Sequence, residues 1–182
     1  MFKIKFRIVD DIESLSSITA KTFDYEYDQI LGFFQMHFGT HQEGSYYHEN
    51  PLERGESGGE LLDYWFDKLL QTIILLDQGF NYVAFKEIET VNRWIEIVKR
   101  DDNLLLNVAI DDSCKNNNLM LTTKYLFSYI EPLDFTISYK EFKMGVLEMA
   151  KEFFVELKKI NEELTYTQMG KTLRRKLSIV SK

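Results

Sequence analysis

Cysteine, proline and glycine are all scarce in this chain, which contains 1 Cys, 2 Pro and 9 Gly among 182 residues. The single cysteine, Cys114, excludes a disulfide within the chain, and such cysteine usage is typical of the reducing cytoplasm. Because proline and glycine are common in flexible linkers, their scarcity predicts one folded domain over residues 1–182 with no low-complexity linker.

Long apolar runs are also missing. The longest, Ile73 to Leu76, is far shorter than the ~20 residues that a membrane-spanning helix needs. The first residues alternate between apolar and charged types, whereas a signal peptide has an unbroken apolar stretch. We therefore expect a cytoplasmic protein that does not act at a membrane.

The short motifs of common catalytic sites do not occur either. The sequence contains no Gly-rich phosphate loop, no G-x-S-x-G and no paired C-x-x-C. Cys114 has no neighbouring histidine or aspartate arrangement that would activate its thiol. The sequence therefore predicts neither an enzyme nor a bound cofactor.

Positive charge is in short supply over most of the chain. Residues 1–138 contain 12 Lys and Arg against 23 Asp and Glu, residues 139–182 contain 10 against 6, and the net charge is −7. The acidic body would repel the phosphate backbone of a nucleic acid. We therefore expect no nucleic-acid partner, and a basic protein as the partner if the charge serves recognition.

Two amphipathic helices are the clearest features that the sequence does contain. Ser138 and Glu141 have the S-x-x-E spacing of a capping box, and apolar residues then recur every three or four positions, which predicts a helix over residues 138–160. A second helix is predicted over residues 60–76. Its apolar stripe is broad enough to be covered on two sides.

Alternating or β-prone apolar residues predict the strands, and the polar residues 100–103 predict the turn of a hairpin. We predict an α+β fold, with an antiparallel or mixed sheet of five to seven strands packed against the two helices. The predicted strands cover residues 2–8, 30–38, 80–85, 93–99, 104–110, 119–130 and 135–137.

Two segments lack a regular pattern. Residues 39–59 are rich in His, Glu, Gly, Ser, Tyr and Asn, and they form the longest predicted loop. Loops of this length are uncommon in compact domains and often have a function. Residues 165–182 form a basic C-terminal tail, whose weak helical period is interrupted by Gly170.

The three histidines, His37, His41 and His48, are the only residues with the composition of a metal site, with Glu43 and Glu49 nearby. Four residues of a strand span roughly 13 Å, so His37 and His41 share an ion only if Gly39 turns the chain back. We predict no metal site and retain a metal-dependent enzyme at these histidines as an alternative function.

Acidic and tyrosine residues are interleaved between positions 43 and 67. Structural duties, such as favourable charge at the start of the helix at 60–76, explain some of them. Complementary charge also speeds the encounter of two proteins, and tyrosine is enriched where binding energy is concentrated. The candidate partner-binding residues are Glu43, Tyr46, Tyr47, Glu49, Glu53, Glu56, Glu60, Asp63, Tyr64 and Asp67.

Three segments resemble small bacterial immunity-type proteins, many of which accompany polymorphic toxins. They are GELLDYWFDKLL at 59–70, RWIEI at 93–97 and FTISYKEFKMGV at 135–146. The likeness covers residues 55–160, and its motifs are structural, so no functional residue can be carried over. The resemblance implies a protein that blocks a cognate toxin by steric occlusion.

A third interpretation is a structural or regulatory homodimer. The helix at 60–76 carries more apolar surface than one packed side requires, and such surface can form a symmetric interface. The sequence thus favours a binding protein, with a metal-dependent enzyme and a homodimer as alternatives.

Overall fold

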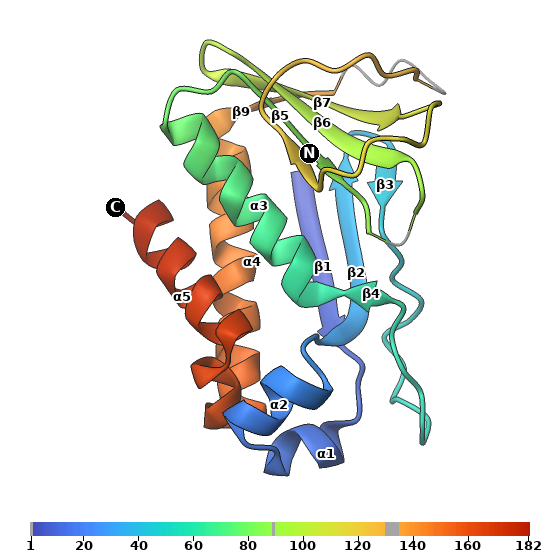
Figure 1. Cartoon of the computed structure of the whole chain (residues 1–182), viewed down its shortest axis with the longest axis vertical. Coiled ribbons are helices and arrows are strands. Elements are labelled where there is room, and N and C mark those ends of the chain that lie inside the picture. The colour runs from blue at the N-terminus through green and yellow to red at the C-terminus, as the bar shows by residue number, and fades with distance from the viewer. Residues whose placement is uncertain (1, 89, 130–134) are drawn as a thin grey trace.

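The computed structural model describes residues 2–88, 90–129 and 135–182, which adopt the predicted α+β architecture (Figure 1). In place of the single sheet of five to seven strands that the sequence predicts, these residues form two antiparallel sheets, of four and five strands. The long helices lie beside the four-stranded sheet, which we call sheet A. The five-stranded sheet, sheet B, lies across one end of the molecule.

Sheet A contains the amino-terminal strands. β1 (Phe2–Ile8) pairs with β2 (Leu31–Phe38), and the chain turns at Gly39 into β3 (His41–Glu43). β4 (Glu60–Leu61) pairs with the start of β2. Phe6 lies opposite Phe34 in this register, so the apolar residues of β1 and β2 share the face that packs on the helices.

Sheet B has the order β8-β5-β6-β7-β9. The predicted hairpin is confirmed, and Asp101 at its turn has a φ of 54°. The predicted strand at 119–130 is wrong over most of its length, because only two of its residues form β8 and Ser128 makes one isolated bridge to Ile110. Residue 130 lies outside the described residues. The strands are β5 (Tyr82–Lys86), β6 (Arg93–Arg100), β7 (Asn103–Ile110), β8 (Met120–Leu121) and β9 (Phe135–Ser138).

Both long helices occur close to where the sequence predicts them. Ser138 caps the second one, because its Oγ accepts a hydrogen bond of 3.1 Å from the backbone N–H of Glu141. Glu60, predicted as the start of the first helix, instead belongs to β4. The helices are α1 (Ile12–Ser17), α2 (Ala20–Glu26), α3 (Leu62–Asp77), α4 (Tyr139–Ile160), the short 3₁₀ helix η1 (Glu162–Tyr166) and α5 (Gln168–Val180).

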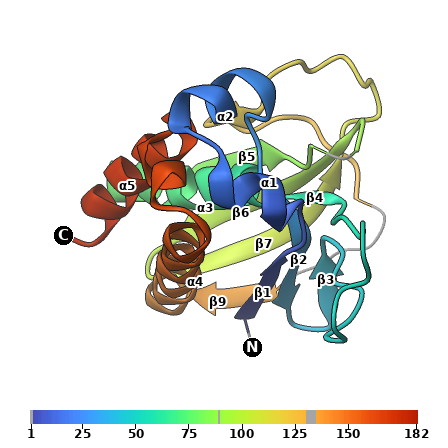
Figure 2. The ribbon, with the colours of Figure 1, turned by 90° about the horizontal axis from the view of Figure 1, so that it is seen from below.

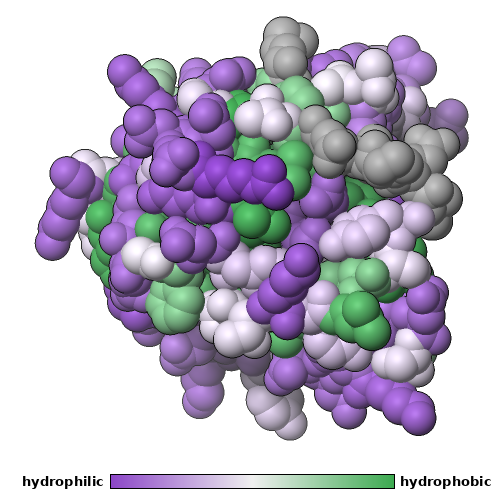
Figure 3. All heavy atoms as spheres, turned by 90° about the horizontal axis from the view of Figure 1, so that it is seen from above, coloured by the Kyte–Doolittle hydropathy of each residue, from purple (hydrophilic) through white to green (hydrophobic). Residues whose placement is uncertain are grey.

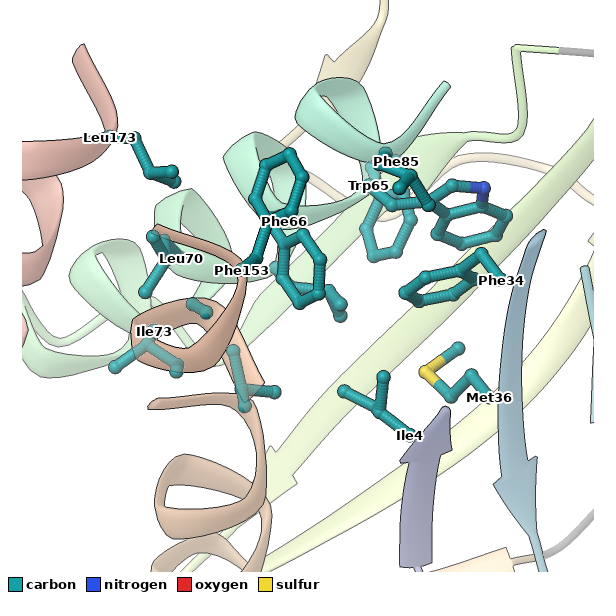
Figure 4. Close-up of a cluster of buried hydrophobic side chains, with 14 of the residues drawn as sticks. Ile4, Phe34, Met36, Trp65, Phe66, Leu70, Ile73, Phe85, Phe153 and Leu173 are labelled. Carbon is teal, nitrogen blue, oxygen red and sulfur yellow. The ribbon is translucent and has the colours of Figure 1, made fainter. Parts of the chain in front are cut away.

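One large core joins both sheets to the helices (Figure 4). Trp65 of α3 stacks on Phe34 of sheet A with 4.5 Å between ring centroids, and it contacts Phe85 of sheet B edge-on. Phe66, one residue further along α3, stacks on Phe153 of α4 at 4.9 Å. The broad apolar stripe of α3 is therefore covered within the chain, which removes the surface on which the homodimer interpretation depended.

The predicted basic tail forms a packed helix. α5 packs along α3, and its Lys176 is only 5% exposed. The Nζ atom of Lys176 lies 2.5 Å from Oδ1 of Asp67 on α3. Gly170 lies inside α5, where a Cβ atom would come within 2.3 Å of the carbonyl oxygen of Leu164. Close packing therefore explains this glycine, and it does not interrupt the helix.

The outer side of sheet B carries a smaller apolar cluster, in which Trp94 packs against Phe127. Figure 3 views the molecule from the sheet B end, where apolar side chains form small groups separated by hydrophilic ones. Among the described residues, no helix has the length and apolar character required to cross a membrane.

Candidate functional site

The ten candidate partner-binding residues occupy three separate places and do not form one continuous surface. Glu43 and Glu60 are buried between the sheets, whereas Asp63, Tyr64 and Asp67 lie on α3 beside α5. The other five lie on the long loop, which runs along the outside of sheet A; they are Tyr46, Tyr47, Glu49, Glu53 and Glu56.

Glu43 lies at the junction of the two sheets and is 2% exposed. Its carboxylate contacts the guanidinium of Arg93 on β6 and the imidazole of His41 on β3. The Nε atom of Arg93 also lies 3.2 Å from Oε2 of Glu87. Because a buried carboxylate is costly without such partners, this cluster has a structural explanation.

Glu60 is buried in the same region and accepts a hydrogen bond of 2.8 Å from the indole of Trp65. Like Glu43, it cannot contact a partner in this structure. Nearby Glu87, which the sequence did not single out, has its pKa raised to about 7 by burial and then by the negative charge of Glu43. Glu87 can therefore exchange a proton near neutral pH, where most carboxylates are fully ionised.

The three residues on α3 also have structural partners. Asp63 accepts a hydrogen bond of 2.9 Å from the backbone N–H of Ile30, and burial raises its pKa to about 6. Tyr64 donates a hydrogen bond of 2.6 Å to the carbonyl of Lys86, and Asp67 forms an ion pair with Lys176. A pocket of about 260 Å³ lies between these residues and the start of α5.

The long loop is held against sheet A at several points. Arg7 of β1 donates a hydrogen bond of 2.7 Å to the carbonyl of Asn50, and Tyr46 donates one of 2.8 Å to Glu49. Tyr47 packs edge-on against Phe33 while remaining 66% exposed. The loop therefore has a defined path that presents part of its length to solvent.

Further along, the loop meets the residues that follow β1. The backbone N–H of Gly58 donates a hydrogen bond of 2.7 Å to the carbonyl of Val9, and a Cβ atom on Gly58 would overlap the backbone of Gly32. Only glycine permits this close approach. The approach of Gly58 to Val9 brings residues 52–57 beside residues 10–13.

These two segments enclose a hollow of about 520 Å³, which we call the acidic hollow. Asp10 and Asp11 accept backbone hydrogen bonds that fix the turn and cap α1, whereas Glu13 and Glu53 are exposed. Ile12 and Leu52 supply apolar surface between the charges. The carboxylates that line the hollow are Asp10, Asp11, Glu13, Glu53 and Glu56, with Arg54 as the single cation in the lining.

Residues 10–13 were missed by sequence reasoning, although three acids directly after a strand are visible there. Their proximity to the loop follows from the approach of Gly58 to Val9 across 49 positions of the sequence, which no local pattern encodes. Chemically, the hollow offers anionic and apolar surface, so it suits the binding of a cationic group.

The histidines have three different partners. His37 lies 2.7 Å from Gln35, His41 contacts Glu43, and Nε2 of His48 lies 2.8 Å from Glu56. Throughout the part of the chain that the structure describes, no group of three His, Cys, Asp or Glu side chains is placed to hold a metal ion. The geometry thus gives the metal-dependent alternative no support.

Comparison of this chain with protein-family models, with curated proteins and with solved structures found no match.

Proposed function

We propose that this protein is a binding module of the immunity type, which neutralises a cognate basic toxin by occluding it sterically. The observation that carries the proposal is the acidic hollow, in which five carboxylates and one arginine surround apolar surface. Charge of one sign around an apolar centre favours fast encounter with a basic protein and then burial of an apolar side chain.

The anchoring of the loop supports the same proposal. Glu56 accepts a hydrogen bond of 2.9 Å from the backbone N–H of Glu53 and pairs with His48, so the rim of the hollow is fixed before a partner arrives. A surface that is already ordered loses less conformational entropy on binding. Of the ten residues suggested by the sequence, Tyr47, Glu49 and Glu53 are the most exposed.

The resemblance to immunity-type proteins supplies the class of partner. α3, the β6–β7 hairpin and the capped start of α4 are the three elements that carry this resemblance. A cytoplasmic site of action suits such a role and the free, exposed Cys114. No cofactor enters the proposal.

The proposal is tested by purifying the tagged protein gently from its host and identifying any stoichiometric basic polypeptide by native mass spectrometry. That polypeptide is then expressed alone and together with this chain. We expect growth arrest in the first case and normal growth in the second. A co-purified polypeptide that is harmless when expressed alone would contradict the immunity role.

A further inference from the structure

The pocket of about 260 Å³ between α3 and α5, which we call the helix pocket, lies apart from the acidic hollow. Its walls are residues 63–67 of α3 and residues 168–173 of α5. Figures 1 and 2 both show α5 lying alongside α3. The helix pocket and the acidic hollow have no lining residue in common, so they are separate features of the molecule.

The two walls of the helix pocket are held in place by contacts outside it. At the start of α5, the backbone N–H of Gln168 donates a hydrogen bond of 2.8 Å to Oδ1 of Asp24 on α2. Further along, the ion pair between Lys176 and Asp67 holds α5 against α3. A pocket that is already formed needs little reordering when a ligand enters.

Most of the α5 wall is apolar, because Met169 and Leu173 line it together with Thr172. On the α3 wall, the hydroxyl of Tyr64 already donates its proton to the carbonyl of Lys86. Ligand pockets are typically apolar and aromatic, with a few polar groups that orient the ligand. The helix pocket is slightly smaller than the ~300–1,000 Å³ of sites for drug-sized molecules, so its ligand is small.

Asp63 is a half-buried carboxylate in this pocket that has no cation beside it. Its Oδ1 accepts the hydrogen bond from Ile30, whereas Oδ2 has no hydrogen-bond partner in another described residue. Oδ2 is not one of the buried atoms that lack a partner, so solvent reaches it. Within the described part of the chain Asp63 forms no ion pair, since Lys68 and Lys176 both contact Asp67 instead. An ammonium group at Oδ2 would supply the missing opposite charge.

The charges that face Asp63 also favour a cation. Burial is the largest cause of its raised pKa of about 6, and the negative charges of Asp28, before β2, and Asp67 raise it further. The charge of Asp67 is met by its two lysines, so Asp63 is the carboxylate that a ligand can pair with. An anionic ligand would instead bring like charges together.

We propose that the helix pocket binds a small organic cation, with a primary ammonium group at Oδ2 of Asp63 and a short apolar or aromatic body against Met169 and Leu173. This inference goes beyond the proposed function and does not depend on it. A metal ion is a poorer candidate, because no group of three His, Cys, Asp or Glu side chains in the described residues is placed to hold one.

The test uses benzylamine, titrated into ¹⁵N-labelled protein. We expect saturable shifts of the backbone amides of Asp63, Met169 and Thr172, with a Kd of about 1 mM. Benzyl alcohol has nearly the same shape without the charge, and benzoate has the opposite charge, so both should bind at least about tenfold more weakly. Equal affinity for benzylamine and benzyl alcohol, or no saturation by benzylamine in the millimolar range, would overturn the inference.

Two variants locate the site. Asp63→Asn keeps an oxygen that can accept from the N–H of Ile30 but removes the charge, and Thr172→Phe fills the pocket from α5; each should weaken benzylamine binding at least about tenfold. Asp112→Asn and Ser178→Phe make corresponding changes at exposed positions and should leave binding unchanged. Thermal denaturation verifies that each variant is folded. Undiminished binding to both pocket variants would place benzylamine elsewhere and overturn the inference.

Benzylamine binding should also weaken in acid. With a pKa of about 6, Asp63 is almost fully ionised at pH 8, but only about a tenth of it is ionised at pH 5. Benzylamine is cationic at both pH values, so its affinity should fall about tenfold from pH 8 to pH 5. The affinity of Asp63→Asn should change little. An equal affinity of the native chain at both pH values would contradict pairing with Asp63.

A lysine side chain of a partner protein carries the same ammonium group, and a further probe distinguishes this source from a free ligand. Lysine blocked at both backbone ends presents the ammonium as a protein would, and we expect it to bind more weakly than benzylamine. Tighter binding of blocked lysine would overturn the inference of a free small ligand. Because benzylamine binding and neutralisation of the toxin are measured separately, the inference and the proposed function can fail independently.

Discussion

Arg93 and Glu43 are 50 residues apart in the sequence, yet their side chains form an ion pair that joins sheet B to sheet A. Glu43 is almost completely buried, and Oε2 of Glu87 lies 3.2 Å from Nε of the same guanidinium. The relative position of the two sheets therefore depends in part on one cation that contacts two carboxylates.

Replacing Arg93 by methionine should lower the free energy of unfolding by about 2–3 kcal/mol, because it leaves buried carboxylates without their cation. The effect is smaller than for a fully buried pair, since the side chain of Arg93 is 34% exposed. Urea denaturation measures the change. Arg100→Met, at the exposed end of the same strand, is the control, and equal stability of the two variants would refute the role of the cluster.

The raised pKa of Glu87 predicts a dependence of stability on pH. The pKa is about 7 in the folded chain against an ordinary value of 4.5, so between these values the folded state binds more protons than the unfolded state. The free energy of unfolding should therefore fall as the pH rises through this window. The change in the free energy of unfolding caused by Glu87→Gln should therefore be more favourable at pH 8 than at pH 5, by on the order of 2 kcal/mol.

Denaturation of the native chain and of Glu87→Gln at the two pH values tests this prediction. Glu53→Gln, at an exposed position, should show no difference between them. A Glu87→Gln effect that is the same at pH 5 and pH 8 would mean that Glu87 is already ionised at the lower pH.

Local patterns were sufficient to predict the elements whose contacts are close in sequence. The cap at Ser138 and the turn at Asp101 are encoded by neighbouring residues, so α4 and the β6–β7 hairpin were found. The division into two sheets was not found, because strand pairing partners are not specified by periodicity. Glu60 was assigned to a helix, since its two-residue pairing with β2 depends on a strand almost thirty positions earlier.

Gly170 provides a test of the packing between α5 and η1. A glycine inside a helix usually costs stability, so Gly→Ala alone would stabilise α5 by up to ~1 kcal/mol. Here the added Cβ would lie 2.3 Å from the carbonyl oxygen of Leu164, and we expect Gly170→Ala to destabilise the protein by about 1–3 kcal/mol.

Lys171→Ala, at the exposed neighbouring position, is the matched control and should change stability little. Both variants can be compared by thermal and urea denaturation. A stabilised Gly170→Ala protein would show that α5 does not pack against η1 this closely.

The candidate site was predicted only in part, for a related reason. The acidic character of the loop is visible in the sequence. Its acidic residues were expected to be exposed to solvent, but Glu43 and Glu60 are buried. The residues that complete the acidic hollow, Asp10 to Glu13, lie about forty positions before the loop residues 52–57 that line its other side. Burial of a carboxylate depends on a distant cation or donor, here Arg93 and Trp65, which composition does not reveal.

The most direct test of recognition through the acidic hollow is the affinity of the co-purified basic partner for two variants with the same change in net charge. Glu13→Lys/Glu53→Lys reverses two exposed charges at the hollow, and Asp102→Lys/Asp112→Lys reverses two exposed charges elsewhere. We predict at least about tenfold weaker binding for the first variant, and a much smaller loss for the second. Equal losses for both variants, or no loss for the first, would contradict recognition through the acidic hollow.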